Sequence, residues 1–222
     1  MNIELTGVDK VYRVGKRLVH ALNDVDLVLK EGELVSIIGP SGSGKTTLLN
    51  IIGGLERPTG GRVMVGKKDI THLPDRTLSS LRLRTFGFVF QSFFLIPHLT
   101  AIENVMVPMR EAGRTRSASR RDAGTLLKKV GIENRAHHLP MQMSGGEQQR
   151  VAIARALAND PPIILADEPT GELDSGNSRM IMGLLRDLNR EEKRTVVVVT
   201  HDPQVAKACT RNYRISDGTL SH

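Results

Sequence analysis

The sequence predicts an α/β fold built on a parallel sheet, with a helical segment inserted into it. Two apolar stretches, IILA at 163–166 and VVVV at 196–199, have the length of buried strands. A helix-length segment at about 176–191 separates them, and such alternation is typical of a parallel sheet covered on both faces. From about residue 92 to residue 160, apolar residues instead recur at helical spacing, which indicates an insertion into the α/β core.

The remaining elements follow from local patterns in chain order. Strands are expected at 3–8 and 19–29, and the apolar run at 33–39 leads into a glycine-rich loop. A helix at 48–55 ends at the turn 57–61, a short hairpin covers 62–70, and a further strand covers 86–91. Helical patterns occupy 103–109, 121–132 and 147–158, and strands return at 162–169 and 195–202.

Composition limits the classes of function. The chain has 222 residues, enough for one domain or one domain with an insertion. Its net charge of +7 suits a polyanionic ligand, an anionic membrane or a nucleic acid and does not choose among them. Aromatic residues make up only 3%, which disfavours a base-stacking surface. Cys209 is the single cysteine, so we expect a reducing compartment, and we expect neither a signal peptide nor a membrane span.

Residues 39–46, GPSGSGKT, match the phosphate-binding pattern G-x-x-x-x-G-K-[ST] in full, after a strand and before a helix. Glycines allow backbone N–H groups to surround the phosphates, and a helix that starts here directs its N-terminus at the anion. Lys45 is expected to reach the β- and γ-phosphates, and the Thr46 hydroxyl to ligate Mg²⁺. The expected nucleotide-binding residues are Gly39, Pro40, Ser41, Gly42, Ser43, Gly44, Lys45, Thr46 and Thr47.

Polar residues that end three other strands complete this site. Ligands of open α/β sheets bind at the carboxyl ends of strands, so we expect Asp167 to hold Mg²⁺ through water and Glu168 to polarise the attacking water. Gln91 ends the strand at 86–91 and can contact both metal and water, and His201 can reach the γ-phosphate. Each alone has an ordinary alternative: an acidic turn, a surface glutamine or a strand-end histidine.

Two further features point to the nucleotide. Tyr12, ahead of the first hairpin, can stack on adenine, although a core or edge tyrosine explains it as well. In MSGGE (143–147), Ser144 and Glu147 form a capping box that starts a helix. Gly145 and Gly146 remove side chains from its first turn, which suits close approach by an anion.

The ordered set Tyr12, GPSGSGKTT, Gln91, MSGGEQQ, IILADE, ELD and His201 resembles the ATP-binding cassette (ABC) ATPases over essentially the whole chain. MSGGE is the specific element, because other P-loop enzymes lack it. The resemblance implies an α/β P-loop NTPase (RecA-like) core with an N-terminal antiparallel β subdomain and an inserted α-helical subdomain. The catalytic core would comprise 1–91 and 161–222, the helical subdomain 92–160, in a single nucleotide-binding domain.

The resemblance also implies how the site works. Two chains would sandwich two ATP molecules head to tail with Mg²⁺, and Ser144, Gly145, Gly146 and Glu147 would face the γ-phosphate held by the partner's phosphate loop. Asp174 matches the loop that crosses this dimer interface. Glu168, His201, Lys45 and Gln91 would be catalytic, and Thr46, Gln91 and Asp167 would hold the metal.

The sequence between the motifs is similar to that of one branch of the family, the ATPases of macrolide exporters and lipoprotein-releasing complexes. That similarity implies an ATPase on the cytoplasmic face of the cell membrane, held there by a permease that docks near 92–105. Glu172 stands where that branch usually has Asn, and we expect its charge beside Asp174 to weaken dimer closure. There are two alternative interpretations. The first is a soluble ABC protein acting on nucleic acid or ribosomes; a single cassette without coiled-coil heptads disfavours it, so no nucleic acid is expected as partner. The second is a P-loop kinase, which MSGGEQQ disfavours.

Overall fold

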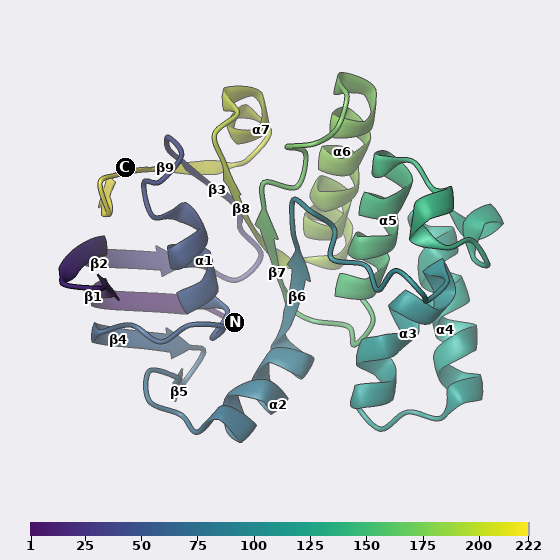
Figure 1. Cartoon of the computed structure of the whole chain (residues 1–222), viewed down its shortest axis with the longest axis horizontal. Coiled ribbons are helices and arrows are strands. Elements are labelled where there is room, and N and C mark those ends of the chain that lie inside the picture. Colours follow the sequence, from purple (N-terminus) through teal and green to yellow (C-terminus); the bar gives the residue numbers. More distant parts are fainter. Residues whose placement is uncertain (222) are drawn as a thin grey trace.

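A six-stranded sheet forms the centre of the computed structural model, which describes residues 1–221 (Figure 1). Its strands are β3 (Leu34–Ile38), β6 (Phe86–Val89), β7 (Ile163–Asp167), β8 (Thr195–Thr200), β9 (Arg211–Ser216) and β10 (Thr219–Ser221). They lie in the order β10-β9-β3-β8-β7-β6, and all neighbours pair in parallel except β9 and β10. The parallel sheet expected from the sequence is confirmed, with β9 and β10 as additions.

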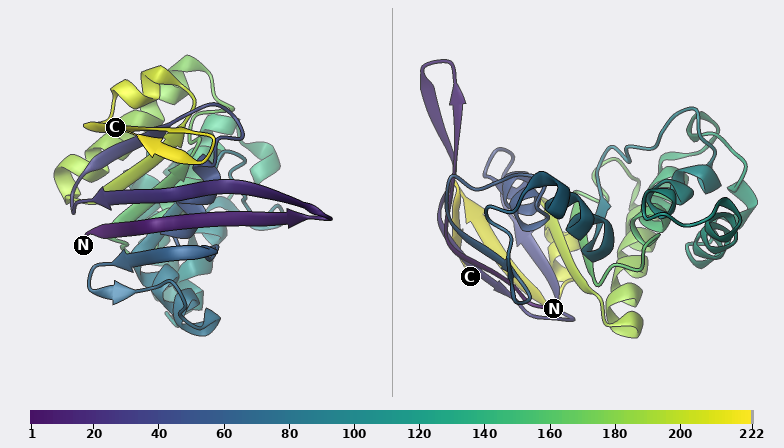
Figure 2. Two further views of the ribbon diagram at one scale, coloured as in Figure 1. Left: turned by 90° about the vertical axis from the view of Figure 1, so that its left-hand side faces the viewer. Right: turned by 90° about the horizontal axis from the view of Figure 1, so that it is seen from below.

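A second, antiparallel sheet packs beside the first and comes mainly from the N-terminal part of the chain. It contains β1 (Ile3–Val14), β2 (Arg17–Leu29), β4 (Gly60–Val65) and β5 (Lys68–Asp69) in the order β2-β1-β4-β5. The β1–β2 hairpin projects from the body of the molecule (Figure 2). Because β1 continues past residue 8 to Val14, Tyr12 lies inside this hairpin, paired with Val19, and the expectation that it precedes the hairpin is wrong.

Seven α-helices complete the part of the chain that the structure describes. They are α1 (Lys45–Ile52), α2 (Asp75–Thr85), α3 (Ala101–Glu111), α4 (Arg116–Lys129), α5 (Gly145–Ala156), α6 (Ser175–Glu192) and α7 (Pro203–Lys207), with 3₁₀ turns at Glu133–Arg135 and Pro140–Gln142. The sequence did not predict α2 or α7. In α2 only Leu78 and Thr85 are buried, so it lacks the apolar stripe by which an amphipathic helix is recognised.

The two faces of the central sheet are buried in two different cores. Successive strand residues point to opposite faces, and β8 shows the consequence. Val196 and Val198 pack in the core formed with α3, α4, α5 and α6, whereas Val197 and Val199 pack in the core formed with α1 and the antiparallel sheet. This double coverage explains why the strand reads as an uninterrupted apolar run.

Helices α3, α4 and α5 form a group at the far side of β6, seen at the right of Figure 1. α3 packs on α4 and α5, and α5 packs on β6, so the group is continuous with the central sheet. In the described range 1–221, no helix combines the length and the apolar character needed to cross a bilayer.

Candidate active site

A cavity of about 640 Å³ lies at the carboxyl ends of the central strands. The loop between β3 and α1, the end of β7 and the residues just after β6 and β8 contribute its walls. The lining residues are Ala21, Pro40, Ser41, Gly42, Gly44, Lys45, Thr46, Thr47, Gln91, Asp167, Glu168 and His201. Most of the site residues expected from the sequence therefore meet around one hollow, as the parallel topology requires.

The loop before α1 has a conformation that demands glycine. Gly44 caps α1 with a φ of 103°, a left-handed conformation that an L side chain rarely adopts. Lys45 is 7% exposed, and its Nζ donates hydrogen bonds of 2.9 Å to the carbonyl oxygens of Gly39 and Pro40. The Ser43 hydroxyl is buried with no hydrogen-bond partner among the described residues. A buried cation and an unpaired hydroxyl in a loop of this kind suit an anionic ligand.

A hydroxyl and a carboxylate oxygen, the kinds of ligand that Mg²⁺ prefers, lie close to each other in the cavity. The Thr46 hydroxyl donates to Asp167 Oδ1 at 3.2 Å, which joins the start of α1 to the end of β7. Burial raises the pKa of the Asp167 carboxyl above its ordinary value, and the neighbouring Glu168 acts in the same direction. A divalent cation at this position would favour the ionised form and so offset the cost of burial.

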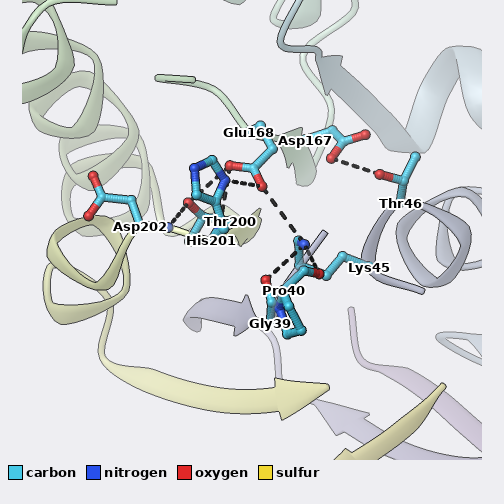
Figure 3. A network of polar contacts seen from close by, with 9 residues as sticks. All are labelled: Gly39, Pro40, Lys45, Thr46, Asp167, Glu168, Thr200, His201 and Asp202. Carbon is cyan, nitrogen blue, oxygen red and sulfur yellow. Dashed lines mark hydrogen bonds and ion pairs between the residues drawn. The ribbon is translucent and has the colours of Figure 1, made fainter. Parts of the chain in front are cut away.

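Glu168 is held by three polar contacts from β8 and its end (Figure 3). Its Oε2 accepts from the Thr200 hydroxyl at 3.2 Å and from the His201 backbone N–H at 3.4 Å, and its Oε1 lies 2.9 Å from His201 Nδ1. The same Oε1 is 4.0 Å from Lys45 Nζ. Glu168 has a positive φ of 45°, a conformation that costs energy and is frequent at functional sites.

Tyr12 and Gln91 differ in how they relate to this cavity. Gln91 lines it, and Gly171 packs so close to Gln91 that an added Cβ would lie 3.2 Å from its side chain. Tyr12 does not line the cavity; its hydroxyl donates to Glu56 Oε2 at 2.5 Å and lies 3.4 Å from Thr47 Oγ1. Burial and then the Glu56 hydrogen bond raise the pKa of Tyr12. Sequence analysis did not find Glu56, because a single carboxylate four residues after a helix forms part of no recognisable pattern.

MSGGE lies outside the cavity and begins α5. The Ser144 hydroxyl accepts from the Glu147 N–H at 3.3 Å, and Glu147 Oε2 accepts from the Ser144 N–H at 2.8 Å, which confirms the capping box. A Cβ on Gly146 would lie 2.2 Å from Asn177 Oδ1 of α6, so a larger residue here would have to displace the Asn177 side chain. None of the four residues Ser144, Gly145, Gly146 and Glu147 lines the cavity that Lys45 faces.

The loop after Glu168 carries Asp174 and Glu172 on the exposed surface. Asp174 caps α6 by accepting from the N–H groups of Gly176 at 2.8 Å and Asn177 at 3.0 Å. Those hydrogen bonds hold the pKa of the Asp174 carboxyl below its usual range. Glu172 accepts a long hydrogen bond, 3.5 Å, from the Ser92 hydroxyl.

A second hollow, of about 420 Å³, lies between α2, β6, α3 and α5. Its apolar lining residues include Leu55, Leu83, Phe86, Phe88, Phe90, Phe94, Val107 and Pro108. Phe94 is 63% exposed and rests its ring edge on Phe90, with 5.2 Å between centroids. Within the segment 92–105, where the permease is expected to dock, Leu95 packs against the helical core while Phe94 faces the groove.

Comparisons with known proteins place this geometry in a family. The family model described as "ABC transporter" matches residues 22–171. The chain belongs to the ABC transporter family. An uncharacterized ABC transporter ATP-binding protein of Methanocaldococcus jannaschii is 53% identical over 98% of this chain and 94% of its own length. A macrolide export ATP-binding/permease protein of Sodalis glossinidius is 47% identical, and the chain spans only 33% of that protein.

A solved structure supports both the fold and the enzymatic class of this family member. It is the dimeric ATP-binding cassette MJ0796 in a post-hydrolysis state bound to ADP and Pi, with a TM-score of 0.93 and 49% identity. The alignment covers 99% of this chain and 97% of that one. The expected ABC family, its P-loop α/β fold with an antiparallel β subdomain, and its role as the ATP-binding, ATP-hydrolysing subunit of a transporter are confirmed.

Proposed function

We propose that this chain hydrolyses ATP as a Mg²⁺-dependent homodimer that drives a membrane permease. One observation carries the proposal: the expected site residues lie in two separate places on the chain. Lys45, Asp167 and Glu168 meet around one cavity, whereas Ser144 and its helix start lie outside that cavity. Two chains related by a two-fold axis would bring each MSGGE segment to the other chain's cavity.

Glu168 is the residue that we assign to the attacking water. Thr200 and His201 contact both oxygens of its carboxylate, and it lies at the cavity wall, 4.0 Å from Lys45 Nζ. A carboxylate positioned in this way can orient water and accept its proton. Lys45 is already buried and cationic, so it can stabilise the charge of the transferring phosphoryl group without reorganisation.

The residues present fit a Mg²⁺ ion held mostly by oxygen. Thr46 and Asp167 offer a hydroxyl and a carboxylate 3.2 Å apart, and Gln91 offers an amide oxygen from the same cavity. Within residues 1–221 there is no cluster of three or more His, Cys, Asp and Glu side chains able to hold a metal. Phosphate oxygens and water would complete such a shell. The ion, when bound, neutralises charge on the β- and γ-phosphates.

Tyr12 is the residue that we assign to the adenine. Tyr12 pairs with Val19 in the β1–β2 hairpin, and its hydroxyl lies 3.4 Å from Oγ1 of Thr47, which lines the cavity. Lys10 Nζ lies 4.9 Å from the centroid of the Tyr12 ring. A purine could stack on the face of the Tyr12 ring once it displaces the Lys10 ammonium group.

The N-terminus of α5 is the surface that we assign to the partner chain's γ-phosphate. The capping box occupies the N–H groups of Ser144 and Glu147, and those of Gly145 and Gly146 have no acceptor within residues 1–221. Free N–H groups at a helix N-terminus attract anions. Exposed Asp174 lies on the adjoining loop and would face the same interface.

The apolar groove beside Phe94 is the surface that we assign to the permease, next to the expected docking segment at 92–105. Exposed Phe94, Val107 and Leu55 form a patch that a helix of a membrane protein could cover. We assign residues 92–160 to one helical subdomain and the rest of the chain to the catalytic core. The permease would hold the chain at the cytoplasmic face of the membrane, and an apolar docking patch favours this partner over a nucleic acid.

Hydrolysis by the Glu168→Gln variant tests the proposal. The amide keeps the size of the side chain but cannot accept a proton, so we expect ATP binding to persist while turnover falls by a factor of about 10² or more. Titration with labelled ATP gives the affinity, and phosphate release gives the turnover. Normal turnover would move the water-activating role to another residue.

A further inference from the structure

Two of the three residues after Gln91 adopt an unusual backbone conformation. Phe93 and Phe94 are consecutive non-glycine residues with φ of 58° and 45°. The left-handed region is disfavoured for aromatic residues, and such conformations persist only where the surroundings enforce them. The chain therefore needs an anchor at this point, directly between the active-site cavity and the apolar groove.

Arg155 of α5 provides this anchor. Its guanidinium donates to the carbonyl oxygens of both strained residues, at 2.6 Å for Phe93 and through its other terminal nitrogen for Phe94. The side chain lies in the wall of the groove, and burial lowers the pKa of the guanidinium. The guanidinium donates to two backbone carbonyls and to no carboxylate. Because the group is planar and its donors have fixed directions, these hydrogen bonds fix the orientation of both peptide groups.

Gln149, one and a half turns earlier on the same helix, holds the other side of Gln91. Its Nε2 donates to the carbonyl of Phe90 at 3.3 Å and to that of Pro169 at 2.6 Å. Phe90 directly precedes Gln91, and Pro169 directly follows Glu168. The Gln149 side chain is completely buried, so these two hydrogen bonds form out of contact with water, where an unpaired carbonyl is costly.

We propose that Gln149 and Arg155 are positioning residues that fix Gln91 from both flanks, so that the orientation of α5 sets the position of Gln91 in the active site. α5 is also the helix whose N-terminus carries Ser144 and the glycines assigned to the partner's nucleotide. One rigid helix thus joins three features: the trans contact at its start, Gln91 at its middle and the groove beside Phe94 at its end. The inference rests on the role proposed for Gln91, whose amide oxygen would help to hold Mg²⁺ in the active site.

A double-mutant cycle between Arg155→Lys and Gln91→Ala separates positioning from simple destabilisation, with ATP hydrolysis by the full chain as the readout. Lysine keeps the charge but replaces the fork by a single point, so we expect kcat to fall about ten- to a hundredfold with KM for ATP unchanged. In the Gln91→Ala background, Arg155→Lys should cause no further loss. If Arg155→Lys lowers kcat by the same factor in both backgrounds, the inference is wrong.

Arg194→Lys is the matched control. Arg194 is a largely buried arginine that donates to the Pro161 carbonyl and pairs with Asp160 and Glu192, remote from Gln91. We expect this control to lower the melting temperature as much as Arg155→Lys does and to leave kcat unchanged. A loss of kcat in the control equal to that in Arg155→Lys would indicate a general effect of stability and overturn the inference.

Two further measurements keep the test decisive. Gln149→Met removes the hydrogen bonds to Phe90 and Pro169, and it should lower kcat in the same way. In the Gln91→Ala background it should cause no further loss of kcat. If Arg155→Lys does not fold, Gln149→Met replaces it in the double-mutant cycle. Hydrogen exchange should be faster at the amides of Phe93 and Phe94 in whichever variant folds, and unchanged exchange would overturn the inference. If Gln91→Ala alone retains full kcat, the role proposed for Gln91 is wrong and the inference falls with it.

Discussion

Three glycine-to-alanine substitutions should have three different effects on stability, because their surroundings differ. Gly42 has a φ of +79° with nothing within 4 Å of an added Cβ. Gly44 has a φ of +103°, and an added Cβ would lie 2.3 Å from the backbone carbonyl oxygen of Ala21. Gly124, inside α4, has no such φ and open space around it.

The magnitudes follow from these geometries. Forcing alanine into a left-handed conformation costs about 1–2 kcal/mol, which is the whole expected effect of Gly42→Ala. Gly44→Ala adds a clash with backbone, which brings a further ~1–3 kcal/mol and a total of about 2–5 kcal/mol. Gly124→Ala should instead stabilise the protein by ~0.5–1 kcal/mol, because glycine within a helix is unfavourable.

Thermal unfolding followed by circular dichroism measures all three variants. At this chain length each kcal/mol shifts the melting temperature by about 2–4 °C, so Gly44→Ala should lower it by about 4–20 °C and Gly42→Ala by about 2–8 °C. Gly124→Ala should raise it by about 1–4 °C. If Gly42→Ala were as unstable as Gly44→Ala, the reasoning would be refuted, because the close contact with the Ala21 carbonyl oxygen would then add nothing to the loss of stability.

The other predictions concern the ligand, the acid range and the interface. Lys45→Ala should weaken ATP binding itself, because it removes the buried cation of the loop, and unchanged affinity in a calorimetric titration would count against the site. The Ser144 backbone N–H, helped by Arg135, lowers the pKa of Glu147 from 4.5, so this carboxylate stabilises the fold above pH 4.5 and that stability is lost as the pH falls through the lower folded-state value. Glu147→Gln should therefore flatten the decline of denaturation free energy below pH 4.5 while it preserves the cap, and an unchanged slope would contradict this assignment. Glu172→Asn should strengthen ATP-dependent dimerisation in the Glu168→Gln background, and an equal dimer dissociation constant would show that Glu172 does not repel the partner.

The sheet and the phosphate loop were predictable because their signals are local. VVVV at 196–199 is buried on both faces, and GPSGSGKT combines a fixed spacing with its strand and helix context. The capping box at Ser144 and Glu147 is equally local and was predicted correctly. α7 is five residues long, too short to show a helical period, so it could not be found in this way.

Contacts between distant segments carried no sequence signal. The Tyr12–Glu56 hydrogen bond spans 44 residues, and the Arg155 contacts with Phe93 and Phe94 span about 60. Their acceptors include backbone carbonyls, which every residue possesses, so no residue type marks them in advance. The close approach of Asn177 to Gly146 is of the same kind: the sequence predicted an anion site, and it held no sign that a side chain of another helix also lies against this glycine.

Light scattering coupled to size exclusion, applied to Glu168→Gln with and without ATP and Mg²⁺, tests the central claim that MSGGE acts on the partner's nucleotide. The variant keeps the cavity but should not hydrolyse its ligand, so the closed form accumulates. We predict a monomer without ATP and a dimer with it. A monomer under both conditions would contradict an ATP sandwich formed by this chain alone.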